Sequence, residues 1–274
     1  MKKRKMQCII AAVIAMVFIM LAAFNTSLQI TYYEVISSKV KETIRIAFIA
    51  DLHSCNYGSG QIELIDAIIE QEPDILLFGG DIADDKLSTD NTRFVLESIS
   101  NKYPCYYVSG NHEYWSGHID EIKQMFREYG VTVLEGEAKT LELNEQKIDI
   151  CGIDDPEAGN SVFFKQLEMC NDQVDDSNFT ILLAHRPEYI ETYLKYKFDL
   201  ILSGHAHGGQ WRLPGIVNGF YAPNQGWLPQ YAGGNYKFGG KTFIVSRGLS
   251  RESTRIPRIF NRPELVIVNI KNAE

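Results

Sequence analysis

The sequence IRIAFIADLH, at residues 44–53, indicates the fold of this chain. Residues 44–50 are predominantly apolar, as expected for a strand buried on both faces, and Asp51 and His53 follow directly after them. Comparable strand patterns recur at 75–78, 106–108, 131–134, 140–144, 148–152, 179–183, 200–202, 242–246 and 265–270. Helical patterns recur at 60–70, 91–100, 119–129, 161–169 and 187–194. This alternation predicts a layered α/β sandwich.

Residue types that bind metals follow five of the predicted strands. They are Asp51, Asp81, Asn111, His185 and His205. Ligands bind at the carboxyl ends of the strands in an open α/β sheet, so these side chains are expected to meet at one place. Mixed Asp, Asn and His donors without a thiolate suit Mn, Fe or Zn better than Ca or Mg. Two such cations about 3.5–4 Å apart can clamp a phosphoryl group, with a carboxylate bridging them.

Each of these residues belongs to a short motif. The motifs are Asp51-Leu52-His53, Gly79-Gly80-Asp81, Gly110-Asn111-His112-Glu113, the single His185, and Gly204-His205-Ala206-His207. In this order they resemble the signature of the calcineurin-like metallophosphoesterase superfamily, from about residue 44 to about residue 208. The resemblance implies the fold of that superfamily, an α/β protein with a four-layer α/β/β/α sandwich, and a metal-dependent phosphoesterase activity.

The resemblance also implies a role for each motif residue. The metal ligands would be Asp51, His53 and His207 for the first ion, Asn111, His185 and His205 for the second ion, and Asp81 as the bridge. His112 would not bind metal, and would instead protonate the leaving oxygen or stabilise the transition state. The expected cofactors are two divalent ions of Mn, Zn or Fe.

Further candidates lie outside the motifs. Cys55, two residues after His53, is a candidate for lining the substrate pocket. The tail carries arginines that either solvate the surface or bind phosphate or lipid headgroups: Arg247, Arg251, Arg255, Arg258 and Arg262. Residues 208–241 are rich in Gly, Pro and aromatic residues and predict a long structured loop beside the site. The cysteines include no Cys-x-x-Cys pair, which favours separate buried thiols over a zinc site.

The N-terminus predicts a membrane segment. Lys2, Lys3, Arg4 and Lys5 precede an uninterrupted apolar run at residues 8–24. A helix of this length spans roughly 25 Å, which fits an uncleaved anchor, a cleaved signal peptide or, least well, a buried core helix. The basic cluster places the N-terminus in the cytoplasm and the catalytic domain outside the cell membrane, with a single pass. The predicted layout is a basic tip and anchor at 1–24, a linker at 25–43 and a metallophosphoesterase domain at 44–274.

The predicted function is a two-metal hydrolase that cleaves phosphodiester or pyrophosphate bonds, in a lipid-linked or nucleotide-linked substrate, at the outer face of the membrane. A phosphomonoesterase or phosphoprotein phosphatase is the alternative within enzymes, and a binding module without activity is the alternative outside them. A phosphorylated small molecule or lipid and the membrane are the expected partners. The net charge of −8 does not favour a nucleic acid, because an acidic protein gains no affinity from counterion release.

Overall fold

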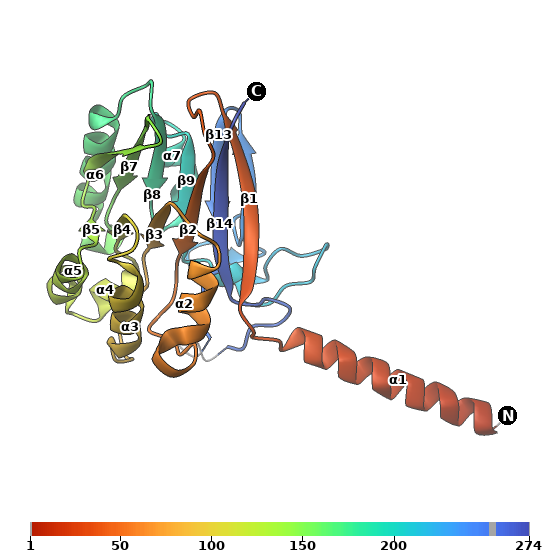
Figure 1. Cartoon of the computed structure of the whole chain (residues 1–274). Coiled ribbons are helices and arrows are strands. Elements are labelled where there is room, and N and C mark those ends of the chain that lie inside the picture. Colours follow the sequence, from red (N-terminus) through yellow and green to blue (C-terminus); the bar gives the residue numbers. More distant parts are fainter. Residues whose placement is uncertain (1, 252–255, 274) are drawn as a thin grey trace.

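The structure is a computed structural model that describes residues 2–251 and 256–273. Two six-stranded sheets form its centre (Figure 1). The first sheet has the order β1 (Gln29–Ser37), β14 (Glu264–Asn272), β2 (Ile44–Ile49), β3 (Ile75–Gly79), β4 (Cys105–Val108) and β5 (Thr132–Val133). The second has the order β12 (Gly234–Phe238), β13 (Lys241–Val245), β9 (Leu200–Ser203), β8 (Phe179–Leu183), β7 (Gln146–Gly152) and β6 (Ala138–Leu143).

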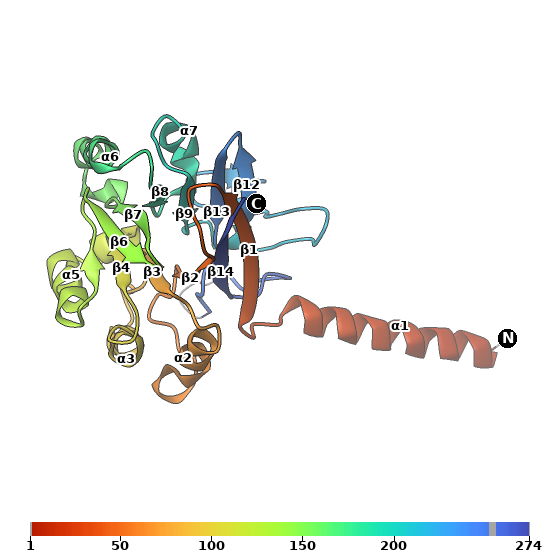
Figure 2. The ribbon, with the colours of Figure 1, turned by 45° about the horizontal axis from the view of Figure 1, so that its top comes forward.

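Helices cover the outer face of each sheet, as Figure 2 shows. The helices are α2 (Ile62–Ile69), α3 (Asp90–Ile99) and α5 (Ile119–Glu128) on the first sheet, and α6 (Asn160–Gln173) and α7 (Ile190–Tyr193) on the second. One apolar cluster packs between the two sheets, and one more lies beneath each helical layer. The predicted four-layer α/β/β/α sandwich is therefore confirmed.

Parallel central strands position the site. β2, β3 and β4 run parallel in the first sheet, and β7, β8 and β9 run parallel in the second. Every residue of β3, β8 and β9 is buried, because sheets covered on both faces need apolar side chains on both sides of each strand. Parallel strands end at the same edge, so the loops that follow β2, β3, β4, β8 and β9 come together.

The connections contain short elements that the sequence patterns did not separate. These are η1 (Ser59–Gln61), α4 (Asn111–Trp115), η2 (Pro156–Ala158), η3 (Pro187–Tyr189), η4 (His207–Gly209), and the hairpin of β10 (Tyr221–Ala222) and β11 (Gly226–Trp227). The helix predicted at 187–194 is thus a 3-10 turn followed by the short α7. The region predicted as a loop at 208–241 also contributes β12 to the second sheet.

The predicted linker at 25–43 is wrong for residues 29–37, which form β1. This strand pairs in parallel with β14 along its whole length, from Gln29 opposite Glu264 to Ser37 opposite Asn272. Its sequence QITYYEVIS is rich in β-branched and aromatic residues, which fit a pleated surface. The first sheet therefore begins before residue 44.

The N-terminal helix α1 (Lys2–Ala23) projects from the domain, as Figure 1 shows. Its apolar side chains are exposed, and among residues 3–23 only Ala23 at its end is buried. Within the described residues it is the one helix long and apolar enough to span a membrane, with a mean hydropathy of 2.6. The core-helix alternative is wrong, because a core helix would be covered by the protein. An anchor and a signal sequence both fit this helix.

Candidate metal centre

The seven predicted ligands meet at one edge of the sandwich. Asp51 and His53 follow β2, Asp81 follows β3, Asn111 begins α4 after β4, His185 follows β8, and His205 and His207 follow β9. All seven side chains are buried. The two sheets are joined here by a hydrogen bond of 2.8 Å from the backbone N–H of His205 to Asp51 Oδ1. The structure therefore brings together residues that are up to 156 positions apart, Asp51 and His207.

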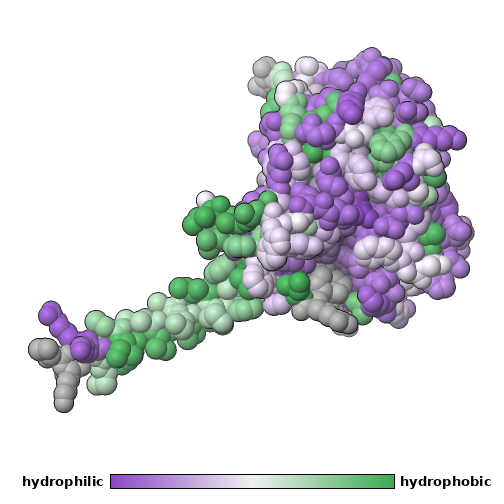
Figure 3. Space-filling view, turned by 180° about the vertical axis from the view of Figure 1, so that it is seen from behind, coloured by the Kyte–Doolittle hydropathy of each residue, from purple (hydrophilic) through white to green (hydrophobic). Residues whose placement is uncertain are grey.

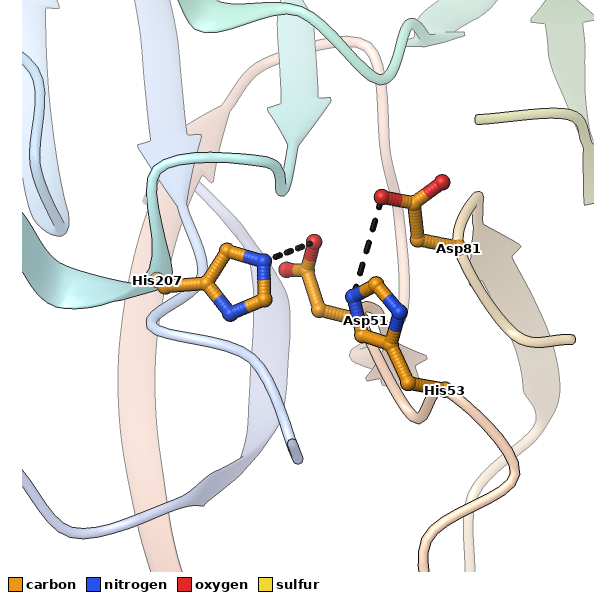
Figure 4. A group of neighbouring side chains, drawn as sticks. All are labelled: Asp51, His53, Asp81 and His207. Atoms are coloured by element: carbon orange, nitrogen blue, oxygen red, sulfur yellow. Dashed lines mark ion pairs between the residues drawn. The ribbon is translucent and has the colours of Figure 1, made fainter. Parts of the chain in front are cut away.

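Six of these seven side chains, all but that of Asn111, form two groups that share one carboxylate. The ligand atoms of Asp51, His53, Asp81 and His207 lie within 4.8 Å of one another, and so do those of Asp81, His185 and His205. Figure 4 shows the first group, with the imidazoles of His53 and His207 turned toward the two carboxylates. Asp81 belongs to both groups, which is the position of a residue that bridges two cations.

The distances place Asp81 between the two groups. Its Oδ2 lies 3.7 Å from Nε2 of His53 and 3.1 Å from Nε2 of His185. His207 Nε2 lies 3.6 Å from Asp51 Oδ1, the other contact drawn in Figure 4. The geometry is that of two adjoining pockets for small cations, each lined by nitrogen and carboxylate oxygen.

Buried polar atoms without a hydrogen-bond partner support this interpretation. Within the described residues they include Asp51 Oδ2, His53 Nε2, Asp81 Oδ2, Asn111 Oδ1, His185 Nε2 and His205 Nδ1. Such atoms are rare in folded proteins, because burial without a partner costs about 1–3 kcal/mol each. Six of them gathered at one place fit divalent ions, which would take up these lone pairs.

The outward-facing ring nitrogens of the histidines are held by the protein. His53 Nδ1 lies 3.1 Å from Asp84 Oδ1, and His207 Nδ1 lies 2.8 Å from Ser250 Oγ. His185 Nδ1 lies 2.8 Å from the carbonyl oxygen of Gly79. When these nitrogens carry the proton, the opposite nitrogen keeps its lone pair for a metal.

The imidazole of His205 has the opposite orientation to those of His53, His185 and His207. Its Nε2 lies 2.9 Å from Oδ1 of Asn224, which also accepts from Nη1 of Arg186 at 2.8 Å. Its Nδ1, which has no hydrogen-bond partner among the described residues, is therefore the nitrogen that faces the centre. Asn224 comes from the loop between β10 and β11, so this loop helps to fix a residue of the centre.

The backbone is strained at five of the seven residues. Their φ angles are 50° at Asp51, 49° at His53, 52° at Asp81, 64° at His205 and 47° at His207. A side chain in this left-handed region costs energy, and such strain concentrates at functional sites where the surrounding structure enforces it. Gly80, at φ 87°, also permits close packing, because a Cβ there would lie 2.7 Å from Nδ1 of His185.

His112 lies beside the two groups and, with His53 and Asp84, forms a third set of side chains whose ligand atoms lie within 4.8 Å of one another. Its side chain is 21% exposed, and its Nδ1 lies 2.7 Å from Asp85 Oδ1. Its backbone N–H donates to Asp81 Oδ1 at 2.8 Å, and its ring meets His53 edge-on at 4.3 Å between centroids. Trp115 packs on its other side at 4.9 Å. His112 is thus both fixed in orientation and reachable from solvent.

The electrostatics of the centre favour cation binding. Burial and nearby positive groups lower the pKa of both His205 and His207, which keeps these imidazoles neutral. Burial raises the pKa of Asp51, with a further contribution from the charge of Asp81. Burial alone would lower the pKa of His185, but the Asp81 and Asp51 carboxylates outweigh it and raise this pKa to about 10. A divalent cation would replace that proton as the partner of the carboxylates.

The Glu113 side chain holds the loops after β3 and β4 together through hydrogen bonds to their backbone. It accepts hydrogen bonds from the backbone N–H groups of Gly110, Asp81, Ile82 and Ala83, at 2.7–3.1 Å. Burial, then the charge of Asp81, raises the pKa of Glu113 to about 7. Its side chain joins the turn after β3 to the start of α4.

The two residues predicted to bind substrate, Cys55 and Arg247, have partners within the protein. Cys55 is fully buried in the apolar cluster beneath α2 and α3, where its Sγ accepts from the backbone N–H of Arg251 at 3.2 Å. Arg247 pairs with the buried Glu264, with Nε donating to Oε2 at 2.7 Å. The Cys55 side chain is thus held inside the protein, whereas that of Arg247 is partly exposed and paired with a carboxylate. Arg255 lies outside the described residues.

Several residues of the centre were missed from the sequence. They are Asp84, Asp85, Arg186, Asn224 and Ser250. Arg258, one of the candidate tail arginines, supports the centre through Nη2, which donates to Ser250 Oγ at 2.9 Å. Asp84 and Asp85 follow Asp81 within four positions, so an acidic pair beside a motif was the available signal. Asn224 and Ser250 gave none, because they reach the centre only through tertiary contacts.

The sandwich and its buried His/Asp centre define a metal-dependent phosphoesterase. The chain belongs to the calcineurin-like phosphoesterase family, whose model matches residues 44–209. The resemblance seen in the sequence motifs is therefore confirmed.

Relatives and solved structures agree with this family. The chain is 31% identical to an uncharacterized metallophosphoesterase of Aquifex aeolicus, over 89% of this chain and 92% of that protein. It is 30% identical to phosphodiesterase YaeI of Escherichia coli, over 82% of each. The crystal structure of the phosphopantetheinyl hydrolase PptH of Mycobacterium tuberculosis covers 81% of this chain and 96% of its own, with a TM-score of 0.50 and 16% identity. This last likeness shows the fold alone.

Proposed function

We propose that this protein hydrolyses phosphodiester or pyrophosphate bonds with two divalent ions of Mn, Zn or Fe. The observation that carries the proposal is the shared Asp81, which joins two groups of buried side chains. Among the described residues, five of the six members of these groups have a side-chain atom without a hydrogen-bond partner. Bound ions would polarise the phosphoryl group and activate a water for attack on phosphorus. The ligands would be Asp51, His53 and His207 on one side, and Asn111, His185 and His205 on the other.

His112 is the proposed general acid. Its ring is more exposed than any of the seven proposed ligands, so the phosphoester approaches from this side. Asp85 holds Nδ1 and thereby directs Nε2 toward the approaching substrate. From there Nε2 donates a hydrogen bond or a proton to the leaving oxygen.

A membrane location is proposed from the N-terminus. The exposed, apolar α1 fits a membrane anchor, and the basic residues before it favour a cytoplasmic N-terminus with the catalytic domain outside. A lipid-linked or nucleotide-linked phosphoester at the outer membrane face is the substrate class that suits this location. Phosphodiesterase YaeI, a relative over most of the chain, supports diester over monoester cleavage.

Activity on model substrates tests the chemistry. We expect hydrolysis of bis-p-nitrophenyl phosphate that depends on added Mn, Zn or Fe and exceeds that of p-nitrophenyl phosphate. His112→Ala should lower kcat by about 100-fold, as the loss of a general acid does. His118→Ala is the matched control, because His118 is 71% exposed and belongs to no motif.

Two results would overturn the proposal. One is the absence of metal-stimulated hydrolysis, which would favour a binding module that keeps the fold without the activity. The other is an unchanged rate for His112→Ala. A clear preference for the monoester substrate would instead assign the protein as a phosphomonoesterase.

A further inference from the structure

An exposed apolar surface lies on the loop between η4 and β12. We call it the apolar loop surface; it consists of Trp211, Leu213, Ile216, Tyr221, Trp227 and Leu228. Ile216 and Trp227 are each 78% exposed, and Leu228 is 66% exposed. Single apolar side chains on a surface are ordinary, but a contiguous group of this size marks a binding surface. Figure 3 shows it as a hydrophobic protrusion beside the base of α1, against a largely hydrophilic domain.

The loop also lacks charge. Residues 213–236 contain no Asp, Glu, Lys, Arg or His, in a chain of which 23% is charged. An ordinary solvent-facing loop of this length would carry several charged residues. The combination of exposed Trp, Tyr, Leu and Ile with no charge is that of a segment in contact with a membrane interface, where aromatic rings are enriched.

The structure connects this surface to α1. The backbone N–H of Phe260 donates to the carbonyl of Ala23 at the end of α1, at 2.7 Å. One residue earlier, Ile259 exchanges backbone hydrogen bonds with Gln210 and Arg212, at 3.2 and 2.9 Å. The end of the proposed anchor and the start of the apolar loop surface are therefore held together by one short segment.

The direction of the loop agrees with this connection. In Figures 1 and 2 the light blue loop extends beyond the sheets on the side of the molecule toward which α1 points. A groove of about 280 Å³ opens in the same place, lined by Trp211, Phe220, Tyr221, Trp227 and Ile256. Its wall also includes Gly209 of η4, two residues after His207, so the apolar surface adjoins the metal centre.

We propose that the apolar loop surface inserts into the lipid bilayer beside α1. The helix brings the domain to the membrane, and Trp227, Leu228 and Ile216 hold it against the acyl region. The domain then lies on the bilayer in a fixed orientation instead of moving freely on its tether. The bilayer is the partner of this surface, because the surface lies next to the end of the apolar helix α1 and its residues carry no charge. The proposal does not depend on the catalytic activity.

Tryptophan fluorescence of the full chain in vesicles tests the proposal. The chain has three tryptophans, and Trp115 lies beside His112 rather than on the apolar loop surface. The double variant Trp115→Phe/Trp211→Phe leaves Trp227 as the reporter, and Trp211→Phe/Trp227→Phe leaves Trp115 as the control. Each is reconstituted in phosphatidylcholine vesicles whose acyl chains are brominated or unmodified. We expect brominated chains to quench Trp227 emission and leave Trp115 emission unchanged.

A second pair of variants tests the surface as a whole. Ile216→Glu/Leu228→Glu places charges at exposed positions, so folding should be retained, as circular dichroism and the melting temperature will show. Trp227 in this background should lose its quenching by brominated lipid and become accessible to aqueous acrylamide. Phe164→Glu, at a 42% exposed position on α6 away from α1 in Figure 1, is the matched control and should leave the quenching intact.

Two outcomes would contradict the proposal. In one, Trp227 is accessible to acrylamide and insensitive to brominated lipid, which means that the surface faces water. In the other, Trp227 is shielded from acrylamide but still insensitive to brominated lipid. That result would assign the surface to contact with a second copy of the chain, and cross-linking in the vesicles would identify it.

Discussion

Asp85 is predicted to orient His112 without contributing to metal binding. Its carboxylate lies 2.7 Å from His112 Nδ1, and it belongs to neither group that shares Asp81. Asp85→Asn should lower kcat by about 10-fold or more, because an amide holds the imidazole less firmly in the required tautomer. Metal content should stay as in the wild type. Steady-state kinetics on the diester substrate and metal analysis of the same samples measure both effects.

The neighbouring Asp84 provides the matched comparison. Its Oδ1 lies 3.1 Å from Nδ1 of His53, the ring nitrogen opposite the proposed ligand atom Nε2. The same Oδ1 lies 3.5 Å from Nδ1 of His112. Asp84→Asn should weaken metal affinity by about 10–100-fold, as the loss of such a supporting hydrogen bond does. If Asp84→Asn and Asp85→Asn had the same effect on metal affinity, the assignment of Asp85 to His112 would be wrong.

The sequence predicted many residues of the centre, but it did not predict their backbone conformations. The order and spacing of the motifs identified the seven buried residues and His112, because glycine-flanked Asp, Asn and His directly after apolar runs are typical of a metal site at strand ends. Left-handed backbone at Asp51, Asp81 and His207 could not be predicted, since residues other than glycine rarely adopt it. Asn224 and Ser250 were missed because only folding brings them to His205 and His207.

Among the elements, α5 is predicted to depend on one buried ion pair. Lys123 lies on α5, is 5% exposed, and its Nζ lies 2.7 Å from Asp154 Oδ1 after β7. Lys123→Met leaves that carboxylate buried without its cation, which should lower the free energy of unfolding by about 3 kcal/mol. Lys197→Met is the control, because the exposed pair of Lys197 with Asp176 should contribute less than about 1 kcal/mol. Urea denaturation measures both, and equal losses would contradict the prediction.

The elements were predicted best where burial determines the sequence. β3 and β8, buried at every position, were recognised from their apolar runs. β1 was missed because it lies at the edge of its sheet, where half-buried and exposed residues give a weaker pattern. β12, also an edge strand, was missed for the same reason. An edge position alone does not decide the outcome, because the edge strands β5 and β6 were predicted, at 131–134 and 140–144.

For the whole molecule, removal of metal is predicted to lower stability. Ligands bound only by the native state stabilise it by about 2.7 kcal/mol at a concentration of 100 Kd. For a domain of this size, that corresponds to a melting temperature higher by about 5–10 °C. Because the ligands come from both sheets, bound ions would join the two halves of the sandwich. Protein stripped with a chelator should therefore melt earlier, and added Mn or Zn should restore the transition.

Substitution of the shared carboxylate separates this effect from nonspecific metal binding. Asp81→Asn removes the residue common to both groups, so its melting temperature should respond little to added metal. His118→Ala keeps the centre intact and should respond as the wild type does. A melting temperature that rises equally with metal in Asp81→Asn and His118→Ala would mean that the ions bind elsewhere. Because melting is measured without substrate, this result holds whether the substrate is a diester, a pyrophosphate or a monoester.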